Sequence, residues 1–228
     1  MGHGPVRYAR KAWSKHYRTT GRDNGDVTDP SARRPWFLIV ILLASGIAGL
    51  WAAFALTLDK FAVLQAEIDG VTADLDCNIS VIVQCGANLQ SWQGAVFFGI
   101  PNPVWGLMGW VAPLAVAVAL LAGARFQRWF WLVFNLGLAG ALAFCIWLMS
   151  QSIFVIGTLC PWCMLTWSAA ILAFWTVSFW NLKQGAFGEW GRRPGAALLS
   201  WSPLVAVLCY VIIAIIAQVR LDFVSTLF

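Results

Sequence analysis

Residues 129–182, WFWLVFNLGLAGALAFCIWLMSQSIFVIGTLCPWCMLTWSAAILAFWTVSFWNL, contain no charged side chain. A single helix over this stretch would be about 80 Å long, more than twice the thickness of the hydrocarbon layer of a membrane. The stretch therefore predicts two spanning helices, at 129–149 and from 158 to Lys183, separated by Ser150-Gln151-Ser152 and Gly157. The whole chain is 60% hydrophobic and 11% charged, a composition that indicates an integral membrane protein and excludes a soluble globular domain.

Three further apolar segments are long enough to cross a membrane, at 36–58, 103–124 and 193–220. The predicted fold class is therefore all-α, with five spanning helices. The expected organisation is a basic tail at 1–35, a region of four spanning helices at 36–182, and a segment at 183–228 that holds a turn, the fifth helix and a short tail. Within the bundle, the segment 59–102 is expected to form an outward loop and a half-helix.

Charge predicts how the helices are oriented. Lys and Arg are concentrated in the tail, in the turn after the second span and in the turn after the fourth: Arg125, Arg128, Lys183, Arg192 and Arg193 lie in the two turns. The segment 59–102 carries a single Lys60 and five acidic residues. Because basic loops stay in the cytoplasm, we expect the N-terminus inside, the C-terminus outside, and 59–102 on the outer face of the cell membrane.

A dithiol motif, Cys160-Pro161-Trp162-Cys163, begins the fourth span. Cysteines three residues apart on a helix share a face and can form or exchange a disulfide. With Pro161 as the first helical residue, Cys160 is expected at the N-cap, where the helix dipole favours its thiolate. The motif predicts an attackable outer sulfur, Cys160, and a buried inner one, Cys163.

A second pair, Cys77 and Cys85, lies in the outward segment and could bridge itself. Downstream, 92–100 is apolar but too short to span, so we expect a half-helix at the membrane surface. Two outward cysteine pairs make a relay possible, in which a soluble dithiol reduces Cys77 and Cys85 and this pair reduces Cys160 and Cys163. Disulfides persist on that side of the membrane.

The electrons from such a relay need an acceptor. Both histidines, His3 and His16, lie in the basic tail, and there is no dinucleotide-binding glycine motif after a strand, so neither haem nor flavin is indicated. A lipid-soluble quinone, of the menaquinone or ubiquinone type, fits best because it diffuses within the bilayer to Cys163.

Together these residues resemble the vitamin K epoxide reductase family. The likeness rests on Cys77 and Cys85, on Ser91, on Asn102 in an Asn-Pro-Val-Trp-Gly turn and on the Cys160–Cys163 motif, and it covers roughly 36–182. It implies a four-helix bundle around a quinone. It also implies the activity of bacterial members, which reoxidise soluble catalysts of disulfide formation.

The resemblance also implies a role for each residue. Cys163 would face the quinone, Cys160 would form a transient mixed disulfide with Cys85, and Cys77 would meet the partner. Ser91 and Asn102 would contact the quinone. Many bacterial relatives continue into a thioredoxin-like domain, whereas this chain ends at Phe228, so the expected partner is a separate extracytoplasmic thioredoxin-fold thiol oxidase. Trp167 stands where some animal members carry a tyrosine, which argues against epoxide as a substrate.

Other interpretations of the chain remain open. The four cysteines Cys77, Cys85, Cys160 and Cys163 could bind Zn²⁺ as a structural site in a membrane scaffold, although their spacing favours the redox relay, for which no metal is expected. Cys145 and Cys209 are expected to be packing residues, and Asn135 is expected to bond a neighbouring helix. The basic tail is explained by topology and by contact with membrane lipid, so no nucleic-acid partner is predicted.

Overall fold

The computed structural model describes residues 34–222 and 224, without the side chain of Glu189. The basic tail and most of the C-terminal tail predicted above therefore lie outside the described residues. The regular secondary structure of the described residues is helical, apart from two isolated β-bridges, and loops join the helices. In chain order, its elements are α1 (Trp36–Asp69), α2 (Gly86–Gln90), η1 (Trp92–Ala95), α3 (Asn102–Leu121), α4 (Arg128–Gln151), η2 (Ser152–Ile156), α5 (Pro161–Lys183), η3 (Glu189–Gly191) and α6 (Arg192–Leu221).

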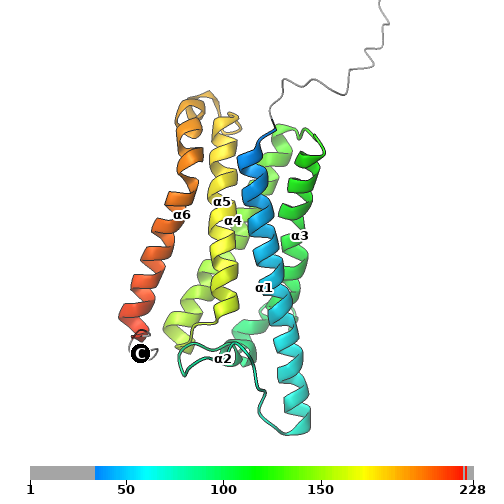
Figure 1. Cartoon of the computed structure of the whole chain (residues 1–228), viewed down its shortest axis with the longest axis vertical. Helices are drawn as coiled ribbons and strands as arrows, with labels where there is room; N and C mark the ends of the chain where they lie inside the picture. The colour runs from blue at the N-terminus through cyan, green and yellow to red at the C-terminus, as the bar shows by residue number, and fades with distance from the viewer. Residues whose placement is uncertain (1–33, 223, 225–228) are drawn as a thin grey trace, which may run out of the picture. The chain divides into compact units, whose positions relative to one another are not determined.

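Five of these helices are long and apolar enough to cross a membrane: α1, α3, α4 with its continuation η2, α5 and α6. The predicted all-α, five-span fold is thus confirmed, and the chain is a multi-pass membrane protein. Figure 1 shows α1, α3, α4 and α5 side by side, with α6 at the edge of the bundle next to α5. The short helix α2 lies near the end of the bundle where α5 begins.

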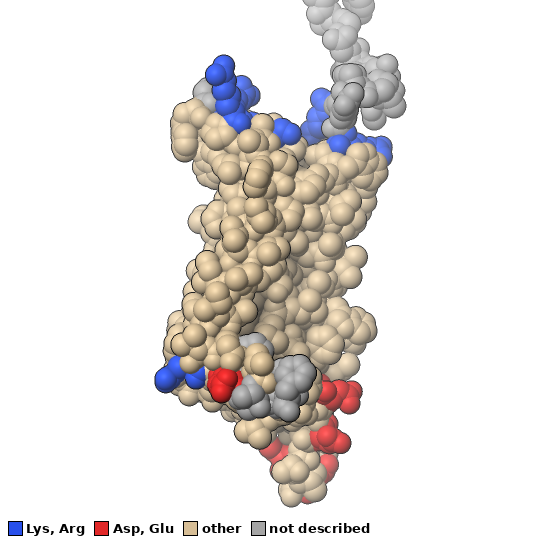
Figure 2. Space-filling model, turned by 60° about the vertical axis from the view of Figure 1, so that its left-hand side comes forward, with Lys and Arg blue, Asp and Glu red and all other residues tan. Residues whose placement is uncertain are grey.

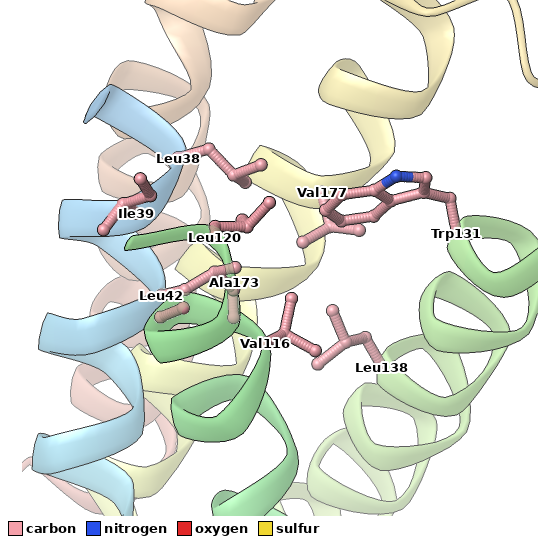
Figure 3. Packing of buried hydrophobic residues seen from close by; sticks show 10 residues of the cluster. Leu38, Ile39, Leu42, Val116, Leu120, Trp131, Leu138, Ala173 and Val177 are labelled. Atoms are coloured by element: carbon pink, nitrogen blue, oxygen red, sulfur yellow. The ribbon is translucent and has the colours of Figure 1, made fainter. Parts of the chain in front are cut away.

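One core cluster is shared by the four bundle helices. It contains Leu38, Ile39 and Leu42 from α1, Val116, Ala117 and Leu120 from α3, Trp131 and Leu138 from α4, and Ala173 and Val177 from α5. Figure 3 shows these side chains pointing toward one another from the four helices. Helix α6 contributes no residue to this cluster and packs along α5.

Polar side chains add specific links between neighbouring helices. Ser178 Oγ donates to Asn135 Oδ1 at 3.0 Å, which joins α5 to α4 and confirms the predicted role of Asn135. Tyr210 of α6 donates to the carbonyl oxygen of Ser168 in α5 at 2.6 Å. In a membrane such bonds position helices because lipid offers no competing partner.

Two helix boundaries differ from the prediction in ways that shape the site. Helix α1 continues beyond the predicted end at residue 58 to Asp69, because 59–69 is an amphipathic segment that buries Val63 and Ala66 and is closed by Gly70 in the left-handed conformation. Helix α4 runs through the predicted break at Ser150 to Ser152, continues as the π-helix η2, and stops at Gly157, whose φ is 77°. Only a glycine adopts such a φ at low cost.

The predicted half-helix over 92–100 begins where expected but is shorter, and another helical turn precedes it. The helical turns are α2 and η1, at Gly86–Gln90 and Trp92–Ala95. After them the chain turns at Phe98 and Gly99, both with positive φ, and an isolated bridge joins Phe97 to Ile100. This tight turn ends the helical segment before it can reach the length expected from its apolar sequence.

Charge separates the two ends of the bundle. Figure 2 shows Lys and Arg at the end where α1 begins and Asp and Glu at the opposite end, with an uncharged zone between them on the face in view. The basic end carries Arg34, Arg125, Arg128, Lys183, Arg192 and Arg193, and the acidic end carries Asp59, Glu67, Asp69, Asp74, Asp76 and Asp222, accompanied by Lys60 and Arg220. The uncharged zone is what a bilayer-spanning surface requires.

Candidate active site

The dithiol motif forms the first turn of α5. Cys160 is the N-cap, Pro161 is the first helical residue, and the backbone N–H of Cys163 lies 3.4 Å from Cys160 Sγ, to which it donates. This is the predicted cap. Both Cys160 and Cys163 are free thiols in this structure.

The exposure of these two cysteines is opposite to the prediction. Cys160, expected to be the attackable sulfur, has 0% of its surface exposed, whereas Cys163, expected to be buried, is partly exposed. The reason is that Cys160 packs in one buried cluster with Cys77, Cys85 and Leu75 of the preceding loop. Cys163 instead borders a cavity. A soluble protein therefore cannot reach Cys160 directly in this state.

Cys77 and Cys85 are joined by a disulfide. Cys85 is completely buried and Cys77 is 5% exposed. Of the two sulfurs, Cys77 is thus the nearer to solvent. It also lies 3.3 Å from Oδ2 of Asp59, which the extension of α1 carries to the same place.

The two cysteine pairs meet at a single contact. Cys160 Sγ lies 3.2 Å from Cys85 Sγ, although 75 residues separate them in the sequence. Thiol–disulfide exchange begins when a thiolate attacks a disulfide sulfur. The arrangement places the capped Cys160 sulfur against one sulfur of the Cys77–Cys85 bond, so it can support exchange between the pairs.

Backbone and side-chain bonds hold this contact. An isolated parallel bridge pairs Val83 with Leu159: the N–H of Gln84 donates to the Leu159 carbonyl oxygen at 3.0 Å, and the N–H of Leu159 donates to the Ile82 carbonyl oxygen at 2.7 Å. Asn88 Nδ2 adds a bond to Thr158 Oγ1 at 2.8 Å. These bonds fasten the residues next to Cys85 to those next to Cys160.

A cavity of about 730 Å³ adjoins Cys163. It lies between α3 and α4 and is closed by α5, α2 and η1, with a largely apolar lining that includes Trp110, Phe144, Cys145 and Trp167. Its volume falls within the usual range for sites that bind small molecules. The cavity is accordingly a place where an apolar, ring-containing ligand can lie against Cys163.

The predicted ligand-binding residues Ser91 and Asn102 both line this cavity. Each also has a structural bond. Ser91 Oγ donates to the Asn88 carbonyl oxygen at 2.8 Å, and Asn102 receives the N–H of Val96 at 3.2 Å while its Nδ2 donates to the Gln93 carbonyl oxygen at 2.7 Å. The side chain of Asn102 therefore holds the backbone of η1 over the cavity.

Comparison with known proteins identifies the family. Residues 40–178 match the vitamin K epoxide reductase family, a segment that contains both cysteine pairs and the cavity. The chain belongs to the vitamin K epoxide reductase family. No curated protein and no solved structure matched the chain. Membership implies that this chain is a membrane thiol oxidoreductase. The structure contains a cysteine pair, Cys77 and Cys85, at disulfide distance.

For this vitamin K epoxide reductase family member, Asp59, Cys77 and Cys85 lie close enough to share a metal ion, but a four-cysteine zinc site would require the Cys77–Cys85 bond to be reduced. Zinc is bound by cysteine thiolates, whereas the sulfurs of Cys77 and Cys85 are bonded to each other. Cys145 is buried in an apolar cluster, as expected of a packing residue, but it also lines the cavity. Cys209 is partly exposed on α6.

Several site residues were not predicted from the sequence. The sequence marks Asp59 only as one acidic residue of the segment 59–102, whereas the structure places its carboxylate in contact with Cys77 Sγ. Gln93 and Gln151 line the cavity, and Gln93 Nε2 donates to Gln151 Oε1 at 3.4 Å across it from η1 to α4. The available signal in the sequence was a polar amide, Gln93, within the apolar segment 92–100, because amides that become buried are kept for a bond or a ligand.

Proposed function

We propose that this protein is a quinone-dependent thiol oxidoreductase that reoxidises a separate extracytoplasmic thioredoxin-fold catalyst of disulfide formation. One observation carries the proposal: Cys160 Sγ lies 3.2 Å from Cys85 Sγ, while Cys163, on the same turn, borders the cavity. The CxxC motif thus links a protein disulfide on one side with a ligand-sized apolar space on the other.

The proposed relay begins at Cys77, the more exposed sulfur of its disulfide. A thiolate of the partner attacks Cys77 Sγ, and Cys85 leaves as a thiolate. The second thiol of the partner then attacks the partner's own sulfur in the mixed disulfide. The partner departs oxidised, and Cys77 is left as a thiol.

The second half of the relay joins the two pairs. Cys85 attacks Cys160 of an oxidised Cys160–Cys163 pair, which forms a Cys85–Cys160 disulfide and releases Cys163 as a thiolate at the cavity. Cys77 then attacks Cys85, restores its own disulfide and releases Cys160. The bonding in the structure, with Cys77 joined to Cys85 and both α5 cysteines free, corresponds to the end of this step.

A quinone of the menaquinone or ubiquinone type is the proposed acceptor. The cavity fits such a group, because it is largely apolar, lies between two membrane-spanning helices and is bordered by aromatic rings with a few amides at one end. A bound quinone would supply two-electron acceptor chemistry. In the proposal, Cys163 delivers the electrons, while Ser91, Gln93, Asn102 and Gln151 bound the polar end of the site.

The proposal places the active site on the extracytoplasmic face. The cysteine pairs lie in the loop after α1 and at the start of α5, which belong to the acidic end of the bundle. Figure 2 shows that the opposite end is basic. Basic ends of membrane proteins face the cytoplasm, and disulfides persist outside it. The N-terminus would then be inside and the acidic end outside, where a secreted or periplasmic thiol protein is available.

The test is turnover by the purified full chain in detergent, with reduced thioredoxin as the thiol donor and a short-chain quinone as the acceptor. We expect quinone reduction to depend on Cys77, Cys85, Cys160 and Cys163, so that each Cys→Ala variant loses at least about 99% of the rate, since each breaks the only chain of exchange. Cys209→Ala is the matched control and should keep the parental rate.

Two results would contradict the proposal. One is quinone-dependent turnover that survives in Cys163→Ala, because the cavity would then have no electron donor. The other is stoichiometric zinc in the purified protein, released when the four cysteines are alkylated, because a structural metal would occupy the proposed active-site sulfurs.

A further inference from the structure

The carboxylate of Asp59 touches a reacting sulfur. Its Oδ2 lies 3.3 Å from Cys77 Sγ. This contact depends on the continuation of α1 past its predicted end, which carries Asp59 to the level of the loop, and on the packing of Leu75 and Cys77 against Leu56 and Val63 of α1. Asp59 is half-buried, so the contact is partly shielded from water.

The relay requires Cys77 to change between thiol and thiolate. A thiol is a poor nucleophile, and exchange proceeds through the thiolate. When Cys77 attacks Cys85, its proton must leave. Because Cys77 is only 5% exposed, bulk water has little access to that proton, and a neighbouring base is the direct route.

We propose that Asp59 is a catalytic residue that holds the proton of Cys77. As Cys77 Sγ attacks Cys85 Sγ in the Cys85–Cys160 disulfide, the Cys77 proton passes to the Asp59 carboxylate, the Cys77–Cys85 bond forms, and the Cys85–Cys160 bond breaks. The electron pair of the broken bond leaves on Cys160 Sγ, which accepts the backbone N–H of Cys163. When the partner later expels Cys77 from their mixed disulfide, Asp59 returns the proton to it. This inference rests on the relay proposed above.

Few other charged or titratable groups face Asp59. Asp76, next to Cys77 in the loop, is close enough to repel a negative charge on Asp59. Lys60 follows Asp59 on α1, but its Nζ donates to the Leu89 carbonyl oxygen at 2.9 Å. Helices α2 and α3 carry no titratable side chain, and the nearby end of α5 contributes Cys160 and Cys163. Asp59 is therefore the carboxylate in contact with the Cys77 sulfur.

A single-turnover experiment on the full chain tests this role. The four-thiol form in detergent is mixed with a short-chain quinone, quenched with acid, alkylated and mapped by mass spectrometry. In the parental protein the Cys77–Cys85 disulfide should form without build-up of the Cys85–Cys160 disulfide. In Asp59→Asn at pH 7 the Cys85–Cys160 species should accumulate, and Cys77–Cys85 should form about a hundredfold more slowly, the low end of what a general base contributes.

Three comparisons separate proton transfer from a change of loop shape. Raising the pH to about 9.5 should close most of the gap between Asp59→Asn and the parental protein, because a free thiol ionises near pH 8.5 without help. Asp59→Glu should recover part of the rate. Asp69→Asn, which removes an exposed carboxylate from the same helix, should behave as the parental protein does.

The outcomes that overturn the inference are distinct from those that overturn the relay. Parental rates in Asp59→Asn at pH 7, or an equal deficit at pH 7 and pH 9.5, would show that Asp59 holds no proton for Cys77 while leaving the relay intact. Absence of any quinone-dependent disulfide in the parental chain would overturn the relay, and the role of Asp59 with it.

Discussion

At the scale of single residues, Cys160 and Cys163 have different surroundings although they lie on one helical turn. Cys160 is sealed beneath the Cys77–Cys85 loop, and Cys163 borders an apolar cavity. Burial suits a sulfur that exchanges only with another cysteine of the same chain, because soluble thiols cannot reach it. The burial of Cys160 is thus compatible with a role in an internal exchange, and it leaves Cys77 as the contact for an outside thiol.

The order of the first pair can be tested by trapping. In Cys85→Ala, the free Cys77 can still attack the disulfide of the oxidised partner, but Cys85 is no longer there to displace the partner from the resulting mixed disulfide, so a covalent complex should accumulate. Non-reducing gels of cells that express this variant should show a larger band, lost on reduction. Cys77→Ala is the matched variant and should show none, because Cys85 is completely buried. A band in Cys77→Ala alone would exchange the two roles.

At the scale of helices, the fit of α1 against α3 depends on small residues. A Cβ added to Gly49 of α1 would clash with the ring of Trp110 in α3, which is buried and lines the cavity. Such overpacking typically costs about 1–3 kcal/mol. The close approach of the two helices therefore also sets the position of one cavity wall.

We accordingly expect Gly49→Ala to lower the apparent thermal midpoint of the detergent-purified protein by several degrees. It should also weaken quinone binding, measured by isothermal titration, since Trp110 must move. The control is Gly140→Ala in α4, where an added Cβ meets nothing within 4 Å. That variant should match the parental protein in both measurements. Equal midpoints for Gly49→Ala and Gly140→Ala would show that α1 and α3 adjust without strain.

The helices themselves could be predicted because charge interrupts the apolar sequence at Arg125, Arg128 and Lys183. The contact between Cys85 and Cys160 could not be predicted from the residues alone. It depends on the bridge between Val83 and Leu159, which is made by backbone groups that any residue carries. The cavity could not be predicted from the residues alone either. The space between α3 and α4 depends on how side chains fit together, which no pattern of hydrophobic residues encodes.

At the scale of the whole molecule, the two ends of the bundle differ in charge and in chemistry. The basic end carries no cysteine among the described residues, and the acidic end carries both cysteine pairs, the loop that covers them and the carboxylate of Asp59. Exchange with a soluble protein is possible only where that protein is found. The orientation of the bundle in the membrane therefore decides which compartment supplies the thiols.

This orientation can be measured with two substitutions that each introduce one additional cysteine. Val81→Cys lies in the loop at the acidic end, where Val81 is 84% exposed, and Ala124→Cys lies in the exposed turn between α3 and α4 at the basic end. A membrane-impermeant maleimide should label Val81→Cys in intact cells, above the background of the parental chain. It should label Ala124→Cys only after the cells are broken, because positive charge keeps that turn in the cytoplasm. The reverse pattern would place the cysteine pairs on the reducing side of the membrane, where a resting disulfide is rare, and would rule out an extracytoplasmic partner.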